Sequence, residues 1–60
     1  MNLYKIYAKK TNKKTGSQSD VPEFVVAKDS EEAEDKFKKE WKGWDIEVYK
    51  NITYMIGIIV

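Results

Sequence analysis

The fold is decided by residues 29–43, which read DSEEAEDKFKKEWKG. Asp29 and Ser30 are both suitable helix N-caps, and Asp29 with Glu32 resembles a capping box. Acidic residues fill the first half of this segment and lysines fill the second, which is the arrangement that the helix dipole favours. The segment therefore predicts a helix over 30–42.

The predicted helix offers only a narrow apolar surface. Ala33, Phe37 and Trp41 lie at helical spacing and form one stripe along it. Gly43 follows and can adopt the left-handed conformation that commonly ends a helix. Trp44 comes next, and we expect the two tryptophans to close the open end of a small core. A helix with one such stripe needs a sheet to lie on.

The rest of the chain supplies four segments with strand patterns. Apolar and polar residues alternate over 3–9, 23–28 and 44–50, as in strands with one buried face. Residues 52–60 are almost wholly apolar, which is typical of a strand buried on both faces. Residues 10–20 contain no apolar side chain, and we expect them to form a mobile loop.

Together these segments predict a single α+β domain over 1–60. The predicted order is ββαββ, with a four-stranded, largely antiparallel sheet and one helix packed on one face. The side chains expected beneath the helix are Tyr4, Ile6, Phe24, Val26, Ile46, Val48, Ile52, Tyr54, Ile56 and Ile58.

The opposite face of this predicted sheet keeps more apolar side chains than a solvent-facing surface needs. Monomers seldom expose contiguous apolar patches larger than a few hundred Å². We therefore expect this face to bind a protein partner, a second copy in a homodimer included. The alternative is that these side chains only supply strand propensity. The candidate contact residues are Leu3, Tyr7, Val25, Tyr49, Met55 and Ile59.

A basic segment offers a second hypothesis, weak and nonspecific nucleic-acid binding. Its candidate residues are Lys9, Lys10, Lys13 and Lys14, with the rings of Tyr4 and Tyr7 close by in sequence as stacking surfaces. The alternative is a solvated loop. All eleven basic residues of the chain are lysines, and the absence of arginine counts against sequence-specific recognition of bases.

An acidic segment offers a third hypothesis. Residues 20–35 carry seven acidic side chains and one lysine. The acids over 29–35 could mimic the charges of a nucleic-acid backbone and make the protein a DNA-mimicking inhibitor. The alternative is that they only complement the helix dipole.

Composition excludes most kinds of catalysis. The chain has no Cys and no His, which removes thiolate nucleophiles, imidazole bases and zinc fingers. We expect the carboxylates over 29–35 to lie on an exposed helical turn, where no apolar pocket raises their pKa. We expect a protein that is not an enzyme, with no catalytic, cofactor-binding or metal-binding residues and no cofactor.

The apolar runs are too short for a membrane protein. The longest, residues 54–60, is far below the roughly 20 residues that span a bilayer. The first residues lack the apolar run of a signal peptide. The sequence therefore predicts a cytoplasmic protein with no membrane partner.

The junction FVVAKDSEEA, residues 24–33, resembles small phage- or prophage-encoded proteins of Gram-positive bacteria. In that family a strand ending in an apolar–Ala pair leads into a capped helix with Glu-Ala in its first turn. The resemblance implies a small accessory protein that acts by binding a host or phage macromolecule. It assigns no functional residue.

Overall fold

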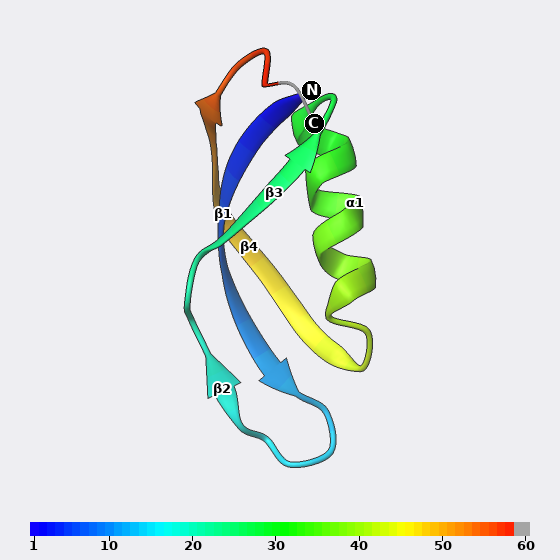
Figure 1. The fold of residues 1–60 in the computed structure, drawn as a ribbon. Helices are drawn as coiled ribbons and strands as arrows, with labels where there is room; N and C mark the ends of the chain where they lie inside the picture. The colour runs from blue at the N-terminus through cyan, green and yellow to red at the C-terminus, as the bar shows by residue number, and fades with distance from the viewer. Residues whose placement is uncertain (59–60) are drawn as a thin grey trace.

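The computed structural model describes residues 1–58 and contains four strands and one helix (Figure 1). The strands are β1 (Asn2–Asn12), β2 (Gln18–Ser19), β3 (Glu23–Ala27) and β4 (Trp44–Met55), and helix α1 (Ser30–Glu40) comes between β3 and β4. All strand pairs are antiparallel. The predicted α+β class, with a four-stranded antiparallel sheet and one helix, is confirmed.

Strand β1 is the centre of the sheet. It pairs with β4 along one edge and with both β2 and β3 along the other. Lys10 of β1 pairs with Ser19 of β2, and Ile6 of β1 pairs with Glu23 of β3. The two pairs have the same register along β1. Pro22 lies in the gap between β2 and β3 and has no backbone N–H to donate to a ladder. Strands β2 and β3 are therefore two parts of one edge strand that is interrupted over residues 20–22.

Helix α1 begins where its sequence predicts. The Asp29 carboxylate caps it by accepting from the Glu32 backbone N–H at 2.8 Å. Glu32 and Lys36, four positions apart on the helix, form an ion pair of 3.3 Å. The helix ends at Glu40, two residues earlier than expected, and Gly43 then takes a φ of 91° to lead the chain into β4.

The core lies between α1 and one face of the sheet (Figure 1). Its members are few, and three of the seven are alanines. The buried apolar side chains are Tyr4, Ile6, Ala8, Val25, Ala27, Ala33 and Phe37, with Trp41, Ile46 and Val48 packed against them. Among residues 1–58, no helix lies over the other face of the sheet.

The predicted orientation of β3 is wrong. Val25 and Ala27 are buried beneath α1, whereas Phe24 and Val26 lie on the open face. Val25 pairs with Tyr4 of β1, and directly paired residues share a face of the sheet. Residues 24–27 are all apolar, so their sequence does not say which face is inward. Val25 is thus a core residue, only 9% exposed, and not part of the open face as predicted.

The prediction of two separate strands over 44–50 and 52–60 is also wrong, because residues 44–55 form the single strand β4. β1 has 11 residues and offers a pairing partner along almost all of β4. Residues 56–58 leave the sheet and return towards the N-terminus, where the Ile58 amide donates to the Met1 carbonyl at 2.8 Å. Ile59, a predicted contact residue, lies outside the described residues.

Two β-bulges in β4 change which side chains face the helix. Tyr49 and Tyr54 are extra residues at the two places where the pairing with β1 shifts by one. After Tyr49 the alternation reverses, so Asn51 faces α1 and donates to the Ser30 carbonyl at 3.2 Å. Ile52 was expected beneath the helix but pairs with Lys5 on the open face.

The predicted mobile loop over 10–20 is mostly a strand pair and a turn. β1 continues to Asn12 and pairs with β2. The Asn12 side chain accepts from the backbone N–H of Lys14 at 2.9 Å and of Thr15 at 3.2 Å. Such local bonds order a turn. The hairpin tip projects beyond the end of α1 (Figure 1).

The molecule is elongated, measuring 38 by 16 by 16 Å. No helix within residues 1–58 is long and apolar enough to cross a membrane.

Candidate functional site

The open face of the sheet carries a group of aromatic and lysine side chains. Tyr4, Ile6 and Ala8 of β1 face α1. The residues that alternate with them along β1 therefore face the opposite side of the sheet. The strand pairing identifies the residues of β3 and β4 that lie beside them on this face. We call this group the aromatic–lysine face, and its members are Lys5, Tyr7, Phe24, Tyr49, Lys50 and Tyr54.

The four rings of this face form two pairs. The centroids of Phe24 and Tyr54 are 5.0 Å apart in an edge-to-face arrangement, and those of Tyr7 and Tyr49 are 6.2 Å apart. Both distances are typical of favourable aromatic pairs. Phe24 and Tyr54 remain 52% and 58% exposed. The rings are thus held in place by one another while much of their surface stays open.

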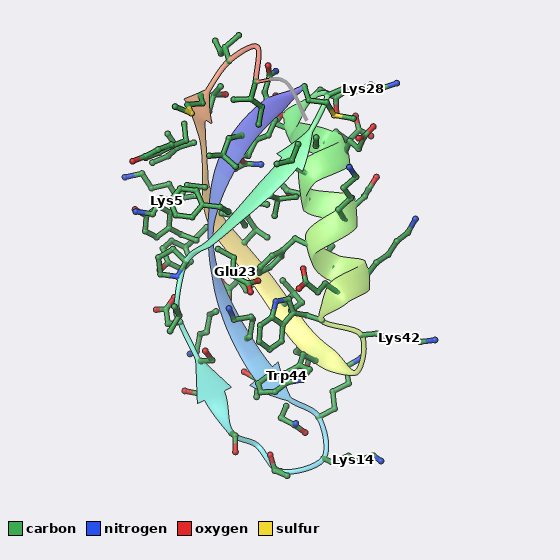
Figure 2. All side chains as sticks on the ribbon, viewed as in Figure 1. Lys5, Lys14, Glu23, Lys28, Lys42 and Trp44 are labelled. Carbon is green, nitrogen blue, oxygen red and sulfur yellow. The ribbon has the colours of Figure 1, made fainter. Side chains whose placement is uncertain are left out.

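The two lysines lie over these rings. The ammonium of Lys5 is 5.2 Å from the centroid of Tyr7 and 5.6 Å from that of Phe24, so it joins the two aromatic pairs. The ammonium of Lys50 is 5.6 Å from the Tyr7 centroid. Figure 2 shows Lys5 extending from the side of the sheet opposite α1. Within residues 1–58 neither lysine forms an ion pair with a carboxylate.

One carboxylate contacts the face at its border. The Tyr49 hydroxyl donates to Asp20 Oδ1 at 2.7 Å. This hydrogen bond raises the pKa of Tyr49 above its ordinary value, and desolvation and the negative charge of Asp20 raise it further. Tyr49 therefore stays neutral at physiological pH, and its ring is tethered to the edge opposite β4.

The predicted contact residues are only partly brought together. Leu3 and Tyr7 are half-buried on the open face, where Leu3 pairs with Met55. Tyr49 and Met55 lie on the same face and are more than half exposed. The members that the sequence did not single out are Lys5, Phe24, Lys50 and Tyr54. The strand register and the two bulges place them on this face. Neither the register nor a bulge can be predicted from the sequence pattern of one strand alone.

The predicted basic site is not a continuous patch. Lys10 is buried, with 1% of its surface exposed, because it follows Tyr4, Ile6 and Ala8 on the inward face of β1. Lys13 lies near Asp45 at 3.9 Å. Lys14 extends from the hairpin tip (Figure 2), and Lys9 is exposed on the open face.

Lys10 belongs to a cluster at the end of the core. Its ammonium donates to the Val21 carbonyl at 3.0 Å and lies 4.4 Å from the centroid of the Trp41 ring. The Trp41 indole N–H donates to the Glu23 carboxylate, and the ring packs edge to face on Trp44 at 5.2 Å. Trp41 packs against the core, as predicted, and Trp44 packs on Trp41.

The acidic segment makes contacts within the domain. Asp29 caps the helix, Glu32 pairs with Lys36, and Glu34 accepts from the Asn51 side chain at 3.1 Å. Lysines share the same helix, so its surface is mixed in sign. Within residues 1–58 no group of three or more acidic side chains is placed to hold a metal ion.

No family model, curated protein or solved structure matches this chain. The similarity to phage-encoded proteins stays a prediction from the sequence.

Proposed function

We propose that this chain is a small non-enzymatic binding module, and that it contacts another macromolecule through the open face of its sheet. The observation that carries this proposal is the exposure of Phe24 and Tyr54 on the face of the sheet opposite α1. The sequence led us to expect a protein partner, and exposed Met55 on the same face of the sheet is compatible with one.

The arrangement favours binding over a purely structural role. An aromatic ring that is needed only for stability is normally buried in the core, as Phe37 is here. Aromatic side chains are enriched at contact surfaces because a rigid ring offers a large contact area with few rotatable bonds. The rings of the aromatic–lysine face are also fixed by their pairing, so little ordering is needed when a partner arrives.

Site-directed photo-crosslinking in the organism that encodes the protein tests this proposal. A benzophenone side chain replaces Tyr54 on the open face or, as a matched control, Lys38 on the exposed surface of α1. We expect adducts of higher mass from position 54 and few from position 38. Equal yields from the two positions, or no adduct from position 54, would contradict the proposal.

A further inference from the structure

We infer that the aromatic–lysine face binds single-stranded nucleic acid. The inference rests on the proposed function and specifies its partner. It differs from the site that the sequence suggested, because the hairpin lysines are not brought together and Lys10 is buried.

The charges on this face call for an anionic partner. Lys5 and Lys50 lie among the rings, and within residues 1–58 neither has a carboxylate in ion-pair distance. The Asp20 carboxylate at the border of the face already accepts a hydrogen bond from the Tyr49 hydroxyl. A phosphate backbone supplies the missing negative charge.

The aromatic rings indicate which class of anionic partner this face binds. An acidic protein surface would satisfy the lysines but would leave the paired aromatic faces without a planar partner. Unpaired bases stack on such rings, and each stacked base strengthens binding by roughly five- to 150-fold. An exposed lysine–ring contact contributes only about two- to fivefold. An arriving base can therefore displace Lys5 from Phe24 or Tyr7, and the freed ammonium can then contact the adjoining phosphate.

The exposed rings and the lack of arginine also favour a single strand over a duplex. Bases in a duplex are already stacked on each other and leave no free face for Phe24 or Tyr54. The chain also has no arginine, so it lacks the bidentate fork that most often reads guanine in a duplex. We therefore expect single-strand binding with little dependence on base sequence.

Fluorescence anisotropy with a labelled oligothymidylate and with a duplex of equal length tests the inference. We expect the single strand to bind at low salt and the duplex to bind at least tenfold more weakly. Phe24→Ala should weaken single-strand binding roughly five- to 150-fold with an unchanged salt slope. Lys5→Gln should reduce the slope of log K against log salt by about 0.7, the value for one phosphate contact on a single strand.

Two control variants separate this face from general electrostatic attraction. Lys14→Gln removes a charge at the hairpin tip and Lys38→Gln removes one on the helix, so both should leave binding and slope nearly unchanged. Circular dichroism verifies that each variant is folded. A loss from Lys14→Gln equal to that from Lys5→Gln, or equal binding of the duplex, would overturn the inference.

The failure of this inference and the failure of the proposed function have different signatures. If the folded protein does not bind the single strand at low salt, the inference is wrong. Protein adducts from position 54 would then still support a binding module with a protein partner. The absence of adducts from that position would remove the proposed function as well.

Discussion

Lys10 shows how a charged residue can serve as a core residue. An ammonium taken out of water is costly unless other groups replace its hydration. Here the Val21 carbonyl accepts one hydrogen bond, and the faces of Trp41 and Phe37 lie 4.4 and 5.4 Å away. The four-carbon stem meanwhile fills space at the end of the core. Lys10 therefore stabilises the fold mainly through packing and aromatic contact.

Truncation of Lys10 should be much more damaging than truncation of an exposed lysine. We expect Lys10→Ala to lower the free energy of unfolding by roughly 2–3 kcal/mol, because it leaves a cavity beneath Trp41. Lys10→Met keeps the packing and should cost less. Lys14→Ala at the hairpin tip should change stability by no more than about 0.5 kcal/mol. Urea unfolding of the three variants measures these differences, and equal midpoints for Lys10→Ala and Lys14→Ala would show that Lys10 is not buried.

At the scale of elements, β4 is shaped by its two bulges. Each inserts one residue opposite β1 and so preserves the pairing on both sides of it. Because of the bulge at Tyr49, Val48 and Asn51 both face α1 although they are three positions apart. Without it, strict alternation would place Asn51 on the open face and Lys50 beneath the helix. The bulge therefore decides which residues of β4 reach the aromatic–lysine face.

Deletion of Tyr49 should be tolerated, because it removes the extra residue and leaves the pairs Ala8–Val48 and Tyr7–Lys50 adjacent in a regular ladder. We expect the deleted protein to keep the helical signal of the parent, with a modestly lower urea midpoint from the lost contacts with Tyr7 and Asp20. Deletion of Lys9, which is also exposed but is paired with Glu47, should abolish cooperative unfolding. The Lys9 deletion shifts one half of β1 by one residue, so the side chains of that half turn to the opposite face of the sheet.

Circular dichroism and urea unfolding of the two deletions make the comparison. If the Tyr49 deletion is as damaging as the Lys9 deletion, the bulge is required for the twist of the sheet and is more than an insertion.

The elements differ in how far their sequence determines them. Helix α1 is predictable because its cap, charge gradient and apolar stripe are all local features, and Asp29 caps it as its sequence suggests. Strand β3 is predictable as a strand but not in its orientation, since only the pairing of Val25 with Tyr4 decides the inward face. The bulges and the burial of Lys10 depend on contacts between distant segments. The candidate site is formed by these nonlocal features, so the sequence indicated the open face but not most of its members.

At the scale of the whole molecule, stability depends on very few side chains. In the part of the chain that the structure describes, seven apolar residues are buried, and three of them are alanines that contribute little area. Phe37 is the largest apolar side chain among those that are fully buried. A domain of this size rarely has more than about 3–5 kcal/mol of net stability. One large truncation in the core should therefore unfold the entire protein.

The two phenylalanines allow a matched test of this expectation, since the same substitution can be made in the core and on the open face. Phe37→Ala should cost about 3–5 kcal/mol, and we expect no cooperative urea transition at 25 °C and a far-ultraviolet spectrum without helix. Phe24→Ala removes an identical group from a position that is 52% exposed, so the protein should stay folded. A cooperative transition in Phe37→Ala would mean that Tyr4, Ile6 and Trp41 hold the core without it. Unfolding by Phe24→Ala would instead assign the aromatic–lysine face to stability, because a surface kept free for a ligand can lose one ring without loss of the fold.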